Sequence, residues 1–170
     1  MRERGVTVCF TGHRFVNKEE AARLTARLDN VIDRCVARGK TNFICGGALG
    51  FDTLAARRVI AAKERHSSVT LTLVLPCRDQ TSRWKNLEDI NAYRDIKGAA
   101  DEIEYIGIFY SPSCMMERNR RMVDLSSGCI AYYNGKPGGA ASTISYANTV
   151  GVPVVNLFAG AKKRREKSEE

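Results

Sequence analysis

The sequence predicts a three-layer Rossmann-like α/β sandwich with a mainly parallel sheet. Six apolar runs alternate with stretches of helical periodicity from one end of the chain to the other. Most of the runs are apolar throughout, which is typical of strands buried on both faces, because right-handed crossovers place helices on both sides of a parallel sheet. With 170 residues, of which 44% are hydrophobic and 27% charged, the chain suits one folded domain.

The predicted strands are short and separated by intervals long enough for a helix. They are, in chain order, VTVCF (6–10), NFICG (42–46), VTLTLVLP (69–76), EIEYIG (102–107), GCIAYY (128–133) and VPVVNLF (152–158).

Helical spacing of apolar residues fills the intervals. It runs over 21–35, with Gly39 as the expected C-cap, and again over 51–62. Weaker spacing follows the third strand over 84–93, and a helix is expected over about 113–126. The helix after the fifth strand differs, because it is made almost entirely of small and hydroxyl residues.

Composition limits the classes of function. No apolar run approaches the ~20 residues needed to span a bilayer, and the N-terminal segment resembles a first strand more than a signal peptide, so we expect a cytoplasmic protein without membrane contact. The six cysteines lack metal-ligand spacing, which favours reduced thiols and no metal. We expect residues 1–160 to form the domain and 161–170 to be a charged, disordered tail.

The chain carries a net charge of +8, spread among acidic residues except at RNRR (118–121). This charge is compatible with binding to nucleic acid and equally with binding to a phosphate-bearing small ligand. Nucleic acid is not favoured, because basic and aromatic residues do not alternate. It leaves open whether the protein forms a homo-oligomer.

Three glycine-bearing loops are expected to converge at one edge of the sheet. Parallel strands end at the same edge, and ligands of such folds bind there, where the strand order reverses. The candidate ligand-binding residues are Thr11, Gly12, His13 and Arg14 after the first strand, Gly46, Gly47, Gly50 and Asp52 after the second, and Asn134, Gly138 and Gly139 after the fifth.

The glycine pair at 138–139 would let backbone N–H groups at a helix start approach an anion, with hydroxyl donors from Ser142 and Thr143. The alternative is a Pro-Gly turn with small residues chosen for close packing. Asp52 either caps its helix or accepts hydrogen bonds from sugar hydroxyls. His13 and Arg14 contact an anion or act as a base, or they fill a polar loop.

Arg118 is the most informative charged residue. At 100° per residue it falls within the apolar stripe of Met115, Met122 and Leu125, and it therefore points toward the interior. A buried charge needs a partner. Either Asp52 or another acid neutralises the guanidinium, or it reaches the crevice and binds a phosphate. His66 is expected near a helix C-terminus, without a catalytic role.

The segment from Met115 to Ala147 resembles the second half of the SLOG superfamily, which includes the DprA and LOG proteins and a YpsA-like branch. LOG proteins carry Met-x-x-Arg-Lys-x-x-Met before a strand and Pro-Gly-Gly-x-Gly-Thr-x-x-Glu after it. The matching residues are Met115, Arg118, Met122, Pro137, Gly138 and Gly139, whereas Asn119, Ala141, Ser142 and Ser145 replace the motif residues at their positions. Upstream, CFTGHR and GGALGFDTLAA are similar to the YpsA-like branch.

The resemblance implies a protein that binds or senses a nucleotide-derived ligand, either ADP-ribose-like or a nucleoside monophosphate, and requires no cofactor. A second hypothesis is a LOG-like nucleotide phosphoribohydrolase. Its catalytic residues are unknown, because Ser145 stands where LOG enzymes have their glutamate, and either Asp52 or the outward-facing Glu117 would have to substitute. A third is a DprA-like DNA-binding module.

Overall fold

A computed structural model describes residues 2–158, so the predicted domain end at 160 and the predicted tail at 161–170 lie outside the described residues. After a short 3₁₀ turn (Arg4–Val6), strands and helices alternate. They are β1 (Thr7–Gly12), α1 (Lys18–Ala37), β2 (Asn42–Cys45), α2 (Phe51–Ala62), β3 (Thr70–Leu75), α3 (Leu87–Ala99), β4 (Glu102–Tyr105), α4 (Cys114–Asp124), β5 (Gly128–Tyr132), α5 (Gly139–Thr149) and β6 (Val154–Asn156).

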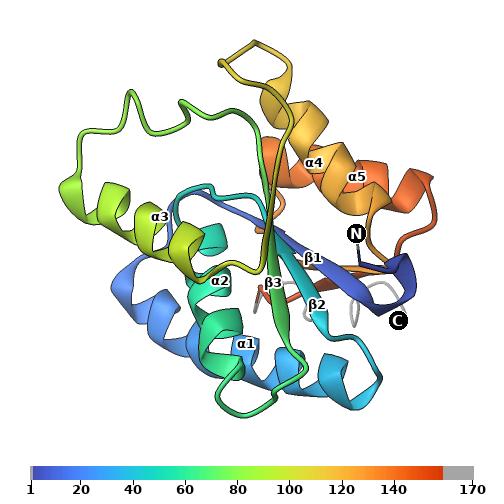
Figure 1. Cartoon of the computed structure of the whole chain (residues 1–170). Coiled ribbons are helices and arrows are strands. Elements are labelled where there is room, and N and C mark those ends of the chain that lie inside the picture. The colour runs from blue at the N-terminus through green and yellow to red at the C-terminus, as the bar shows by residue number, and fades with distance from the viewer. Residues whose placement is uncertain (1, 159–170) are drawn as a thin grey trace.

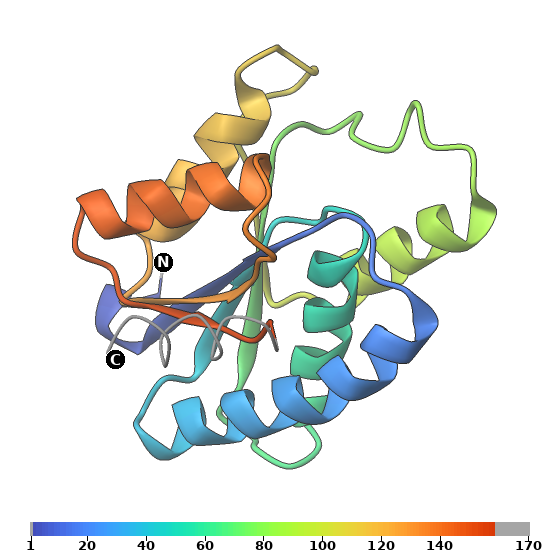
Figure 2. The same cartoon turned by 180° about the vertical axis from the view of Figure 1, so that it is seen from behind.

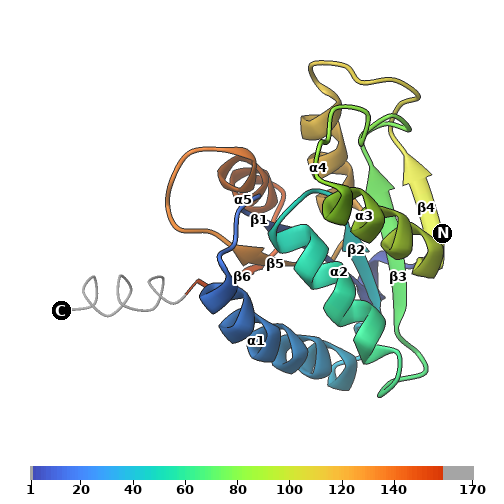
Figure 3. The ribbon, with the colours of Figure 1, turned by 90° about the vertical axis from the view of Figure 1, so that its left-hand side faces the viewer.

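The strands form one parallel sheet in the order β4-β3-β2-β1-β5-β6. The chain builds outward from β1 to β4 and then returns to place β5 on the other side of β1. Helices α1, α2 and α3 cover one face of this sheet, and α4 and α5 cover the other (Figures 1 and 2). Viewed at right angles, the sheet lies between the two helical layers (Figure 3). The predicted three-layer Rossmann-like fold is confirmed.

Alternate strand residues enter two separate cores, because successive side chains of a strand point to opposite faces. Phe10, Phe43 and Leu71 pack with α1 and α2, whereas Cys9 and Ile44 pack under α4 and α5. All six cysteines are free thiols. Among the described helices, none combines the length and the apolar character that crossing a membrane would require.

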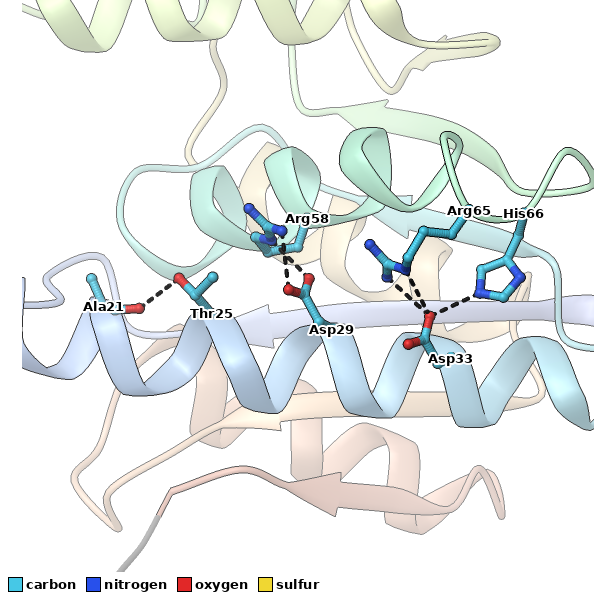
Figure 4. Close-up of polar contacts among 7 residues, drawn as sticks. All are labelled: Ala21, Thr25, Asp29, Asp33, Arg58, Arg65 and His66. Carbon is cyan, nitrogen blue, oxygen red and sulfur yellow. Dashed lines mark hydrogen bonds and ion pairs between the residues drawn. The ribbon is translucent and has the colours of Figure 1, made fainter.

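Charged residues join α1 to α2 on the outer surface (Figure 4). Arg58 forms a two-pronged ion pair with Asp29, at 2.8 and 3.0 Å. One turn further along α1, Asp33 contacts both Arg65 at 2.9 Å and His66 at 2.8 Å. His66 follows the end of α2, as expected. Because α2 begins at the carboxyl edge of the sheet, this histidine lies at the opposite edge from the predicted ligand crevice.

Candidate functional site

A cavity of about 270 Å³ opens at the carboxyl ends of β1 and β2, beside β5. The sheet order reverses at this point, because β2 and β5 flank β1. Its walls come from the loop after β1, the loop after β2 and the first turns of α4 and α5. They are formed by Phe10, Thr11, Gly12, His13, Arg14, Ala48, Asp52, Met115, Arg118, Asn119, Gly139 and Ala140.

Two glycines allow the loops after β1 and β2 to pack against each other. A Cβ at Gly12 would lie 2.7 Å from the Cβ of Phe51, and a Cβ at Gly50 would lie 2.7 Å from the carbonyl oxygen of His13. Gly50 also has a φ of +73°, which side chains with a Cβ rarely adopt. The Phe51 N–H donates to the His13 carbonyl at 3.0 Å, so the start of α2 is fixed against the β1 loop.

His13 joins the β1 loop to the β5 loop. Its Nε2 accepts a hydrogen bond from the Asn134 N–H at 2.9 Å. The Asn134 side chain accepts from the Lys136 N–H at 3.0 Å and does not line the cavity. The structure therefore places Asn134 against His13 rather than in the cavity wall.

Asp52 is a buried carboxylate aimed at the cavity. Its Oδ2 accepts from the N–H groups of Gly46 at 3.2 Å and Ala48 at 3.3 Å. These donors precede α2, so the side chain orders the β2 loop and does not cap the helix. Burial raises the pKa of Asp52, and the nearby Arg118 guanidinium opposes that shift. The carboxylate is thus held at fixed orientation in a site that weakens its acidity.

Arg118 points inward, as its place in the apolar stripe of α4 predicts, and is only 4% exposed. Its Nε donates to the Asn119 side chain at 2.7 Å, its Nη1 donates to the Gly46 carbonyl, and its Nη2 contacts the sulfur of Met115 at 3.6 Å. Within residues 2–158 no carboxylate lies within 4.0 Å of this guanidinium. Burial lowers the pKa of Arg118, and Asp52 opposes the shift by charge attraction.

The two glycines after β2 face different neighbours. Gly46 lies against Arg118, because a Cβ there would be 2.7 Å from Nη1. Gly47 has a φ of +70° and turns away from the cavity toward Tyr93 and Gln80. Neither glycine lines the cavity. The Gly46 carbonyl does, however, accept a hydrogen bond from Arg118, which lines it.

The start of α5 contributes backbone rather than hydroxyl groups to the cavity. Gly138 has a φ of +148°, and Gly139 lines the wall. The Thr143 hydroxyl is buried and donates to the Gly139 carbonyl at 2.8 Å, so it is occupied within the helix. Ser142 and Ser145 line a neighbouring groove of about 780 Å³ between α4 and α5. Both hydroxyls proposed from the sequence therefore lie outside the cavity.

Asn119 is a wall residue that sequence reasoning did not place in the site. It lines the cavity and accepts the Arg118 Nε hydrogen bond. A helical wheel does not reveal it, because it lies 100° from Arg118. Its position does coincide with the lysine of the Met-x-x-Arg-Lys-x-x-Met motif, which is the signal that could have found it.

The fold and the cavity define a Rossmann-like protein with a polar crevice at the switch point of its sheet, containing a buried arginine, a buried aspartate and a glycine-led helix start. The model of the YpsA family, described as the YspA SLOG family, matches residues 9–150, and the chain belongs to this family. The predicted SLOG resemblance is confirmed.

Individual proteins of known sequence or structure are also similar to this chain. The chain is 30% identical over 139 residues to the uncharacterized SPbeta prophage-derived protein YoqJ of Bacillus subtilis (strain 168), covering 74% of this chain and 80% of that protein. DNA processing protein A (DprA) from Streptococcus pneumoniae has a similar fold, with a TM-score of 0.66 and 17% identity over 89% of this chain, which spans 50% of the DprA chain. DprA from Helicobacter pylori, whose structure concerns single-stranded DNA binding, also has a similar fold. Its TM-score is 0.63 and its sequence identity 19%, and the match covers 97% of this chain and 74% of the DprA chain.

Proposed function

We propose that the protein binds a nucleotide-derived ligand, either a nucleoside monophosphate or an ADP-ribose-like molecule, with a phosphate group in the cavity. The observation that carries this proposal is Arg118. A guanidinium that is 4% exposed and has no carboxylate within 4.0 Å among residues 2–158 is costly in the free protein. An anion in the cavity would supply the missing partner, and a phosphate accepts well from a guanidinium.

The start of α5 supports the same assignment. The first hydrogen bond within this helix runs from the Ser142 N–H to the Gly138 carbonyl, so the N–H groups of residues 139–141 precede it. Those groups and the helix dipole favour a negative charge next to Gly139. Arg14, at the exposed mouth of the cavity, adds a second cation.

Asp52 fits a sugar better than a phosphate, because a carboxylate repels an anion and accepts from hydroxyl groups. Both backbone N–H bonds go to its Oδ2, which leaves Oδ1 to accept. Ligand pockets usually measure ~300–1,000 Å³, so a cavity of about 270 Å³ suits the ribose phosphate part of a nucleotide, with the remainder extending beyond it.

Thermal unfolding with AMP, ADP-ribose and NAD, with adenosine as the phosphate-free control, tests the proposal. A ligand at ~100 times its dissociation constant adds about 2.7 kcal/mol, which raises the melting temperature of a chain of this length by roughly 5–10 °C. We expect that shift with at least one phosphorylated ligand and not with adenosine. An equal shift with adenosine, or none with any of the nucleotides, would reject the phosphate assignment.

A second function, nucleotide N-glycoside hydrolysis, is favoured by the state of Asp52. A buried carboxylate with a raised pKa, oriented by two N–H donors, is a known arrangement for acid-base or charge-stabilising work. Asp52 would have to do this work, because Ser145 lies in the neighbouring groove and Glu117 is exposed on α4 and does not line the cavity. Mass spectrometry of AMP recovered from the protein separates the two functions. Release of free adenine that is lost in Asp52→Asn supports the hydrolase, and intact AMP supports a binding protein.

A further inference from the structure

Asn119 joins the buried arginine to the start of α5. Its Oδ1 accepts from the Arg118 Nε at 2.7 Å, and because a guanidinium only donates, this contact fixes which end of the amide faces the arginine. The amide nitrogen faces α5, where a Cβ at Gly139 would lie 3.9 Å from Nδ2. Asn119 therefore presents an uncharged N–H donor beside the backbone N–H groups at the start of this helix, in the wall of the cavity.

The buried part of the cavity wall carries little net charge. Among the described residues that form it, the charged side chains are the two cations Arg14 and Arg118 and the anion Asp52. Arg14 is exposed at the mouth, where water and salt screen its charge. Arg118 and Asp52 are both buried and have opposite charges. The other donors, which are the Asn119 amide and the start of α5, bear no full charge. This wall therefore suits a group with one negative charge better than a group with two.

Phosphate groups differ in charge according to the number of links they make. A phosphate monoester carries about −1.5 to −2 at pH 7, because its second pKa is about 6. A phosphate that is linked on both sides, as in a phosphodiester or within a pyrophosphate bridge, lacks that second acidic proton and carries a single charge. The Asp52 carboxylate repels the second charge of a monoester. Arg118 is the one buried cation among the described wall residues, and it cannot balance both.

The cavity adjoins a second space into which a doubly linked phosphate can extend. Asn119 and Gly139 line both the cavity and the groove of about 780 Å³ between α4 and α5. These two helices lie side by side on one face of the sheet (Figures 1 and 2). Next to Gly139 the groove is lined by the small residues Ala141 and Ser142, and none of its described wall residues is acidic. A phosphate beside Arg118 therefore has the groove available for its second substituent.

We propose that the cavity selects a phosphate that is linked on both sides, and that the uncharged Asn119 is a specificity-determining residue for this choice. The proposal rests on the proposed function and narrows it, because ADP-ribose-like molecules contain such a phosphate and nucleoside monophosphates do not. The lysine of the Met-x-x-Arg-Lys-x-x-Met motif would place a second cation beside Arg118 and would suit a monoester. Asparagine supplies a donor at the same position without adding charge.

Calorimetric titration with AMP, the methyl ester of the AMP phosphate and ADP-ribose tests the proposal. At pH 8, above the second phosphate pKa of about 6, AMP and its methyl ester differ by close to one charge and by the second link. We expect the wild type to bind the methyl ester about tenfold more tightly than AMP, because one charge is left unbalanced in a partly buried site. Asn119→Lys adds a cation beside Arg118, and Asp52→Asn removes the opposing carboxylate with little change of shape. Each variant should reduce the ratio of the two affinities about five- to tenfold. Both ligands contain the same nucleoside, so an altered sugar contact leaves this ratio unchanged.

Asn148→Lys is the matched control, because it makes the same substitution at an exposed residue of α5 that lines neither the cavity nor the groove. It should leave the ratio unchanged. AMP that binds the wild type as tightly as its methyl ester, or more tightly, overturns the selection and leaves the phosphate site intact. A ratio that stays the same in both Asn119→Lys and Asp52→Asn does so too. Binding of ADP-ribose alone among the three ligands supports the selection, and failure of all three overturns the proposed function itself.

Discussion

Replacing Arg118 by methionine removes the buried charge and retains most of the side-chain volume. The guanidinium would contribute a charge-assisted hydrogen bond to the bound phosphate, worth about 1.5–3 kcal/mol. At about 1.4 kcal/mol for each tenfold change, the affinity for AMP or ADP-ribose should fall roughly 10- to 150-fold. Since the only partner of Nη2 among residues 2–158 is the Met115 sulfur, this nitrogen has the most to gain from a ligand.

The free protein should keep its fold in this variant. The substitution loses the hydrogen bonds to the Gly46 carbonyl and to Asn119, but it also removes the cost of burying a cation. Apolar replacement of buried ionic groups is often close to neutral for stability. Circular dichroism checks the fold, and calorimetry measures the affinity. Arg120→Met is the control, because Arg120 is exposed on the same helix and lies over the Tyr146 ring at 5.2 Å.

An affinity in Arg118→Met within about threefold of the wild type would refute the reasoning, since the buried guanidinium would then not contact the ligand. A similar loss in Arg120→Met would also contradict it, because the effect would then reflect net charge rather than a positioned side chain.

Three further predictions concern stability and nucleic acid. Gly50→Ala should lower the free energy of unfolding, measured by urea denaturation, by about 2 kcal/mol or more. The residue has a φ of +73°, which strains a side chain with a Cβ, and that Cβ would overlap the Arg14 backbone. An unchanged urea midpoint would contradict this prediction. The contacts of Asp33 with His66 and then Arg65 lower its pKa below the ordinary value of 3.8, so they stabilise the fold above that pH and are lost as pH falls through the lowered pKa. Asp33→Asn should therefore lower the melting temperature at pH 7, and the difference should shrink below pH 3.8; a constant difference would count against the ion pair. Single-stranded DNA, if it binds, should lose affinity steeply with salt and compete with AMP for the crevice; tight binding without competition would indicate a separate site.

The fold was predictable because its strands carry a strong signal. The run VTLTLVL is mostly apolar and ends in three consecutive apolar residues, which indicates a strand buried on both faces. The structure places Leu71 and Val74 in the two separate cores. The inward direction of Arg118 was predictable for a related reason, because a helical wheel fixes which face a residue occupies.

Other parts of the site were not predictable from residue type. Small and hydroxyl residues at the start of α5 suit either an anion cradle or close packing, and only the structure shows that the Thr143 hydroxyl is occupied by the Gly139 carbonyl.

The most direct test of the central claim is a crystal structure of the protein with the nucleotide that stabilises it most. The account predicts a phosphate oxygen about 2.8 Å from the Arg118 Nη2, with the phosphate facing the N–H groups at the start of α5. A phosphate bound elsewhere, with the Arg118 guanidinium still against the Met115 sulfur, would contradict it.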